Sequence, residues 1–284
     1  MTPPRTELEP APAKLNLGLR VVGRRPDGFH DLDSLFARLA VADTVALRTR
    51  EDGPGDTLRR LPAGVPTLDD RPLTLGPDNL VLRAVAAYRD AAALAGVHVG
   101  PQAVTLTKRI PWGAGLAGGS ADAAATLRAL ARAWPAGVAL GPLAERLGSD
   151  VPFCLADVRA ARVQGRGERV RPVELPEVHL VLANPGVGIA AGDAFRWWGE
   201  DPVDVGAPRF PAIANALEPG VVRRVPPVAA ALAALRALGV GPAAMSGSGS
   251  TCFALTADAA TAAAAALELG RTQPTWWVLA TRVA

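Results

Sequence analysis

The chain has 284 residues, of which 49% are hydrophobic and 20% charged, and its formal net charge is +3. This composition indicates a globular protein with a real core, in one large domain or two ordinary ones. The small net charge and the lack of a basic run argue against a dedicated nucleic-acid-binding protein.

Two further features bound the class of protein. The longest apolar runs, 228–238 and 259–269, are too short to cross a bilayer, and residues 1–7 lack the apolar core of a signal peptide. The two cysteines, Cys154 and Cys252, have apolar neighbours and no metal-ligand spacing, so both are expected to be core residues. We therefore expect a cytoplasmic protein that binds neither nucleic acid nor membrane.

The first 76 residues are predicted to be mainly strands. Residues 1–10 are polar and proline-rich and are expected to form a loose terminus. Residues 12–22 alternate in a strand pattern that puts Lys14 and Asn16 on one polar face, which a solvated edge would explain equally well. A Pro-Asp-Gly turn at 26–28 leads to Phe29 and His30, and a His after a turn is more often a surface residue. Strands follow at 35–40 and 44–48, and residues 51–76 are expected to be irregular, with a short strand or two at most.

Helices and strands alternate in the middle of the chain. Asp78 and Asn79 suit the N-cap of a helix over 80–95 that ends at Gly96, and a strand is predicted at 103–110. A glycine-rich segment, 111–122, then runs into an alanine- and leucine-rich helix. A short helix at 142–147 ends at Gly148, after which Asp150 suits an N-cap or a turn as well as a functional role.

The second half is also mixed. Patterns predict a hairpin around 165–167, a buried strand at 178–183, a short helix from Asp193 and a helix at 227–238. A second glycine loop at 246–251 precedes a strand at 252–255, a helix at 258–269 and a last strand at 276–281.

The segment 111–122 predicts an anion site. Glycine allows positive φ and a close approach to a bound group, and the N–H groups at a helix start attract phosphate. Gly113-x-Gly115-x-x-Gly118 matches the dinucleotide fingerprint, but no acidic residue lies about twenty positions later, and no Lys follows as in a Walker loop. A glycine-rich turn without a ligand is the alternative. Of the 30 basic residues only Lys14 and Lys108 are lysines, which suggests a need for a compact ammonium there.

Four separated motifs together resemble those of the GHMP kinases, a family of small-molecule kinases. They are residues 12–17, 111–120, 147–153 and 245–251, in that order along the chain. The loop at 25–30 resembles the substrate loop of the branch that phosphorylates a cytidine-diphosphate-linked methylerythritol. The resemblance implies a two-domain α+β fold, with a ribosomal protein S5 domain 2-like domain over 1–157 and a ferredoxin-like domain over 158–284. Its implied reaction is ATP-dependent phosphorylation of the substrate's 2-hydroxyl in the non-mevalonate isoprenoid pathway, by a monomer or weak homodimer.

The resemblance also implies roles for residues. Asp150 would be the general base, and Lys14 would stabilise the charge that develops during phosphoryl transfer, a reaction that needs positioning more than covalent chemistry. Asn16, Phe29, His30 and Phe195 would bind the substrate, with His30 on the cytosine and the two phenylalanines on its faces. The second glycine loop would close the substrate side through Ser246, Gly247, Ser248 and Gly249. ATP would be held by Pro111, Trp112, Gly113, Ala114, Gly115, Leu116, Ala117, Gly118, Gly119, Ser120 and Ala121, together with Lys108 and Asn79.

Three positions depart from the family pattern. Ala117 replaces a glycine, which predicts that position 117 does not need positive φ. Ala121 replaces a serine, which leaves Ser120 as the expected neighbour of Mg²⁺, and Phe29 replaces a tyrosine. Two alternatives remain: another GHMP kinase of the mevalonate or homoserine type, or a nucleotide-binding regulator that has lost catalysis.

Overall fold

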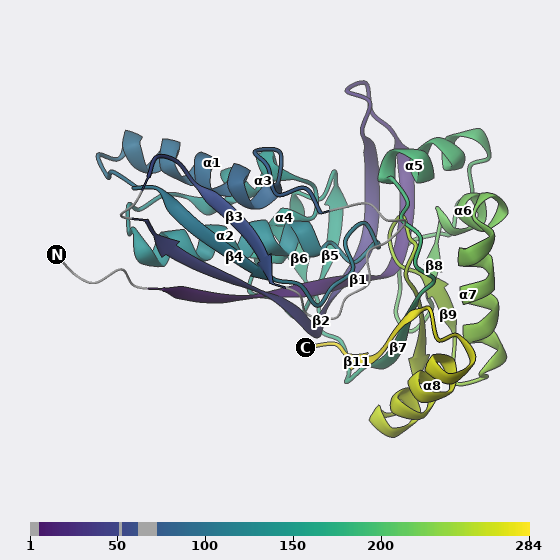
Figure 1. The fold of residues 1–284 in the computed structure, drawn as a ribbon. Helices are drawn as coiled ribbons and strands as arrows, with labels where there is room; N and C mark the ends of the chain where they lie inside the picture. Colours follow the sequence, from purple (N-terminus) through teal and green to yellow (C-terminus); the bar gives the residue numbers. More distant parts are fainter. Residues whose placement is uncertain (1–5, 51–52, 62–72) are drawn as a thin grey trace.

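The protein is built around two β-sheets, each covered by helices (Figure 1). Its structure is a computed structural model that describes residues 6–50, 53–61 and 73–284. Parts of the irregular segment predicted at 51–76, and of the loose terminus predicted at 1–10, lie outside the described residues. Within these ranges, no helix is long and apolar enough to cross a membrane.

The first sheet has seven strands and is organised by one long hairpin. Strands β1 (Glu7–Arg24) and β2 (His30–Thr49) pair antiparallel, joined by the predicted turn at 26–28. The other edge of β2 pairs with β5 near the turn and with β4 further along. The remaining strands are β3 (Thr57–Leu61), β4 (Gln102–Thr107), β5 (Ala160–Gly165), β6 (Arg169–Pro172) and β8 (Ala214–Asn215).

Four helices pack with this sheet around a large apolar core. They are α1 (Leu80–Leu94), α2 (Gly118–Ala133), α3 (Leu140–Leu147) and α4 (Val151–Leu155). Helix α2 is central because its alanines let it lie close to both β1 and α1. The start of α2 is thereby held at a fixed place above the sheet.

The second sheet forms the C-terminal part, with strand order β11-β7-β10-β9 and antiparallel pairing throughout. In chain order this is fourth, first, third, second, the ferredoxin-like arrangement that the family resemblance predicted. The strands are β7 (His179–Asn184), β9 (Ala243–Met245), β10 (Cys252–Thr256) and β11 (Trp277–Arg282). The helices are α5 (Ala191–Glu200), α6 (Glu218–Arg224), α7 (Pro226–Ala237) and α8 (Ala259–Thr272).

A third apolar cluster joins the two sheets. Leu15 and Leu17 of β1 pack in it with Leu180 and Leu182 of β7 and with Phe253 of β10. The central parts of β1 and β2 therefore pack against the C-terminal sheet. Figure 1 shows the hairpin of β1 and β2 running from one half of the molecule to the other.

The structure corrects two boundaries. The expected loose terminus is wrong for residues 7–10, which begin β1; Pro10 and Pro12 are tolerated there because this end of β1 pairs only with β2. The predicted domain boundary at 157 precedes β5, β6 and β8, yet all three strands pair into the first sheet. Both cysteines are buried and free, as predicted.

Candidate active site

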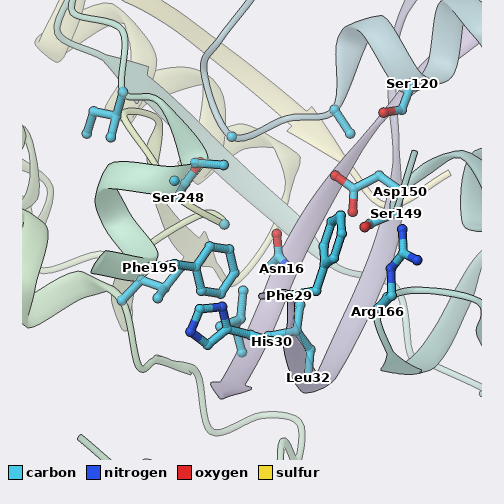
Figure 2. A pocket seen from close by; sticks show the side chains of 18 of the residues that line it. Asn16, Phe29, His30, Leu32, Ser120, Ser149, Asp150, Arg166, Phe195 and Ser248 are labelled. Carbon is cyan, nitrogen blue, oxygen red and sulfur yellow. The ribbon is translucent and has the colours of Figure 1, made fainter. Parts of the chain in front are cut away.

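A cavity of about 980 Å³ lies where the two halves meet. Its wall is made by five segments (Figure 2). They are the part of the β1–β2 hairpin nearer its turn, the glycine loop before α2, the start of α4, helix α5 and the second glycine loop. Seven of the predicted ATP-binding residues line it: Gly113, Ala114, Gly115, Ala117, Gly118, Gly119 and Ser120. So do Lys14 and Asp150 and the predicted substrate residues Asn16, Phe29, His30, Phe195, Gly247 and Ser248.

The charged pair at the floor of the cavity is Lys14 and Asp150. The Lys14 ammonium lies 3.4 Å from a carboxylate oxygen of Asp150 and donates a hydrogen bond of 2.7 Å to the amide oxygen of Asn16. Lys14 and Asn16 are only 3% and 2% exposed, so they do not form a solvated edge. The ammonium also lies 4.6 Å from the centre of the Phe36 ring. An ammonium desolvated in this way needs its carboxylate and amide partners.

Asp150 occupies the N-cap position of α4, but its side chain makes no capping hydrogen bond. The carboxylate faces Lys14 and the cavity, so a purely local capping role does not explain it. Helix α4 was not predicted, because only five residues, one of them Pro152, form it.

The first glycine loop approaches the cavity with its backbone. Gly113 and Gly115 have φ of 70° and 78°, a region that residues with a Cβ rarely adopt. The prediction for Ala117 is wrong: its φ is 54°, and it is the left-handed N-cap of α2 without a side-chain cap. The left-handed conformation of Ala117 turns the chain into α2. The N–H groups of Gly118, Gly119 and Ser120 then have no partner within the helix and are available to an anion.

The second glycine loop supports the first. The Ser246 hydroxyl donates to the Gly115 carbonyl at 3.0 Å, and the Thr251 N–H donates to the Ala114 carbonyl at 3.1 Å. A Cβ on Gly115 would lie 2.2 Å from the Ser246 carbonyl oxygen, so only glycine fits. Ser246 and Gly249 thus lie behind the first glycine loop, whereas Gly247 and Ser248 line the cavity.

Three stacked or edge-on rings, those of His30, Phe195 and Trp198, lie at the end of the cavity away from the first glycine loop. The rings of His30 and Phe195 stack with centroids 4.8 Å apart and planes 16° from parallel, and Trp198 meets the His30 ring edge-on at 5.8 Å. Burial lowers the pKa of His30 below its ordinary value, and the charge of Arg24 lowers it further. In Figure 2, Phe29 and Phe195 lie on opposite sides of Asn16. One face of Phe195 is covered by His30, a contact that the predicted clamp did not include.

Several predicted residues do not reach the cavity lining. Asn79 caps α1, accepting from the Val81 N–H at 2.9 Å and donating to the Thr74 carbonyl at 2.6 Å. Trp112 lies 5.0 Å from the guanidinium of Arg60. Pro111, Leu116 and Ala121 are buried behind the loop.

Lys108 is the largest departure, because the residue is only 1% exposed and its ammonium binds two carboxylates. It donates to Asp122 at 2.7 Å and also to Asp43, whose other oxygen accepts from the N–H groups of Arg109 and Ile110. We call Asp43, Lys108 and Asp122 the buried triad. Burial raises the pKa of Asp122 to about 7, the Lys108 charge opposes that shift, and Asp43 adds to it. The triad lies beneath Gly118, beside the end of β4 from which the first glycine loop starts.

Sequence reasoning missed Ser149, Arg24, Arg166 and Arg196, which also line the cavity. Arg166 lies in the turn between β5 and β6, and its guanidinium is 4.0 Å from the centre of the Phe29 ring. The Gly165-Arg166-Gly167 pattern was visible as a hairpin turn, but its position beside Phe29 depends on the pairing of β5 with β2.

Comparison with known proteins identifies the family of the chain. Residues 79–157 match the family model "GHMP kinases N terminal domain", and residues 206–274 match "GHMP kinases C terminal". A 4-diphosphocytidyl-2-C-methyl-D-erythritol kinase of Deinococcus radiodurans is 47% identical, with 96% of this chain and 92% of the relative covered. One of Paracoccus denitrificans is 41% identical, with 97% and 96% covered.

Solved structures give the same relationship. A crystal structure of 4-(cytidine 5′-diphospho)-2C-methyl-D-erythritol kinase superposes with a TM-score of 0.78 at 35% identity, covering 98% of this chain and all of that one (100%). A homoserine kinase of Cytophaga hutchinsonii shares the fold alone, with a TM-score of 0.66 at 16% identity, covering 98% and 94%. This chain is an ATP-dependent small-molecule kinase of the GHMP family, and within that family it belongs with the 4-diphosphocytidyl-2-C-methyl-D-erythritol kinases.

Proposed function

We propose that the chain transfers the γ-phosphoryl group of ATP to the 2-hydroxyl of 4-diphosphocytidyl-2-C-methyl-D-erythritol, in the non-mevalonate route to isoprenoids. One observation carries the proposal above the others. The Lys14–Asp150 pair lies in one cavity, with the unpaired N–H groups of α2 on one side and the His30–Phe195 stack on the other. A nucleotide phosphate and a nucleobase can therefore both reach the reacting pair.

The reaction follows from these positions. The backbone N–H groups of 118–120 hold the phosphates of ATP, and the dipole of α2 favours their charge. Asp150 accepts the proton of the substrate's 2-hydroxyl. As it does so, the hydroxyl oxygen bonds to the γ-phosphorus of ATP and the bond between the γ-phosphorus and ADP breaks. Lys14, 3.4 Å from Asp150, stabilises the negative charge on the transferring group. Asn16 fixes the ammonium through their 2.7 Å hydrogen bond.

We also propose that Mg²⁺ accompanies ATP, and the donor chemistry supports this. Mg²⁺ retains waters and takes one or two protein oxygens besides the substrate phosphates. The Ser120 hydroxyl and the Asp150 carboxylate lie along one wall of the cavity (Figure 2), and the described residues contain no cluster of three or more His, Cys, Asp or Glu. Bound there, Mg²⁺ would neutralise phosphate charge.

The substrate assignment rests on the aromatic end of the cavity. Mevalonate and homoserine have no base for His30 and Phe29 to recognise, and a neutral imidazole, favoured by the lowered pKa of His30, can donate to a pyrimidine carbonyl. The presence of both Lys14 and Asp150 speaks against a regulator without catalysis.

The test is ADP formation by the purified protein with three acceptors: the cytidyl substrate, mevalonate and homoserine. We expect turnover with the first alone. Equal turnover with mevalonate or homoserine would contradict the substrate assignment, and no ADP formation with any acceptor would favour the regulator.

A further inference from the structure

Arg166 is held rigidly at the edge of the cavity by the turn that carries it. Gly165 and Gly167, on either side, have φ of 73° and 132°. A Cβ on Gly167 would lie 1.9 Å from the Ser149 carbonyl oxygen, so the turn is pressed against the residue that precedes Asp150. The backbone of Arg166 is thus fixed relative to the proposed base.

The guanidinium of Arg166 forms no ion pair in the part of the chain that the structure describes, although its charge acts on Asp27. Of the two other arginines that line the cavity, Arg196 pairs with Asp193 and Glu200, whereas Arg24 forms no ion pair with a described residue. For Arg166, no carboxylate of the described residues lies within ion-pair distance, and its buried Nε has no hydrogen-bond partner. A buried donor without a partner is costly, because it has lost its water. With no carboxylate within ion-pair distance, the charge of the guanidinium is left for an anion that enters the cavity that Arg166 lines.

Arg166 also covers one face of Phe29, with the guanidinium carbon 4.0 Å from the ring centre. This cation–π contact orients the planar fork and fixes the Phe29 ring. Figure 2 shows the guanidinium pointing toward Ser149 and Asp150, with Phe29 between Arg166 and Asn16. Arg166 therefore lies between the base-recognising end of the cavity and the phosphoryl-transfer end.

We infer that Arg166 binds the diphosphate that joins the two ends of the substrate, and that it is a substrate-specificity residue. This rests on the proposed function. In the cytidyl substrate a diphosphate links the nucleoside to the methylerythritol, so when cytosine lies at His30 and the 2-hydroxyl at Asp150, the anion passes between them. The planar guanidinium suits phosphate oxygens in a bidentate contact. Acceptors without this diphosphate, such as homoserine, cannot make the contact.

The experiment compares Arg166→Gln with Arg171→Gln, an exposed arginine on the same hairpin that does not line the cavity. For Arg166→Gln we expect the KM of the cytidyl substrate to rise about 10- to 100-fold, as for loss of a charge-assisted hydrogen bond, while the KM of ATP changes less than about 2-fold. Arg171→Gln should match the unaltered enzyme. Arg166→Lys keeps the charge but loses the planar fork, so its KM for the cytidyl substrate should lie between those of Arg166→Gln and the unaltered enzyme. It keeps the test valid if Arg166→Gln fails to fold.

Calorimetric binding of cytidine and cytidine 5′-diphosphate separates anion recognition from a general disturbance of the site. Arg166→Gln should weaken the diphosphate and leave cytidine unchanged. If the unaltered enzyme turns over the cytidyl substrate but Arg166→Gln binds the diphosphate equally well, or loses cytidine to the same degree, this inference is overturned and the proposed function stands. If the unaltered enzyme does not turn over that substrate, the proposed function fails and the inference fails with it.

Discussion

Replacing Lys108 by Met should destabilise the protein strongly. The Lys108 ammonium is the cation between Asp43 and Asp122, and the three side chains are 2%, 0% and 4% exposed. Met fills similar volume but leaves two carboxylates buried and facing each other. Removing one partner of a buried ion pair costs about 3–5 kcal/mol, which at ~2.1 cal/mol/K of unfolding entropy per residue lowers the Tm of a chain of this size by about 5–8 °C.

Unfolding by heat and by urea measures this effect, with Arg109→Met as the matched control because the neighbouring Arg109 is exposed. The double variant Lys108→Met with Asp122→Asn should recover part of the lost stability, since only one carboxylate then remains. The stability lost in Lys108→Met should also be smaller at pH 5.5 than at pH 8, because the two buried carboxylates take up protons more readily at the lower pH. A Tm within about 2 °C of the unaltered protein, or a double variant less stable than the single one, would refute the role given to the buried triad.

Three further predictions concern single residues. Ala117→Gly removes a Cβ from a residue with φ of 54° and should stabilise the protein by about 0.5–1 kcal/mol, after the entropy cost of glycine is subtracted. Ala121→Gly, in the first turn of α2, should instead destabilise it by about 1 kcal/mol. Denaturant unfolding compares the two variants, and equal losses of stability would contradict the strain at Ala117. His30→Ala should raise the KM of the cytidyl substrate with little change in the KM of ATP, measured by steady-state kinetics, and equal rises would exclude a role on the cytosine. Burial raises the pKa of Asp122 from 3.8 to about 7, so the folded state keeps a proton that the unfolded state loses. The stability of the unaltered protein relative to Asp122→Asn should therefore fall as pH rises from about 4 to 7, by at most ~1.4 kcal/mol per pH unit. Urea unfolding at several pH values measures this difference, and a relative stability that rises over the range would contradict the prediction.

The sequence predicted most of the helices and strands because their patterns are local. The alternation through Lys14 and Asn16, the N-cap at Asn79 and the glycine after α3 all appear where expected. Short elements such as α4, α6 and β8 were missed, since packing rather than pattern determines them. The strand at 7–10 was missed because its prolines resemble a loop, and only the edge position of that segment makes them acceptable.

The candidate site was predictable where residues lie in motifs and unpredictable where three-dimensional contacts decide. Lys14 and Asp150 are 136 positions apart, and only the family resemblance suggested the pairing that the structure gives at 3.4 Å. For Lys108 the same resemblance suggested nucleotide binding, but two carboxylates remote in sequence take its ammonium. The positive φ of Ala117 arises from the way the loop enters α2, which residue type does not reveal.

The most direct test of the central claim is the kcat of Asp150→Asn with saturating ATP and cytidyl substrate. Asn keeps the shape of Asp150 but cannot accept the hydroxyl proton, so we expect kcat to fall about 10²–10⁴-fold, the usual contribution of a general base. Binding of ATP and substrate, measured by calorimetry, should persist in the variant. A kcat within a few-fold of the unaltered enzyme would contradict the assignment of Asp150 as the base beside Lys14.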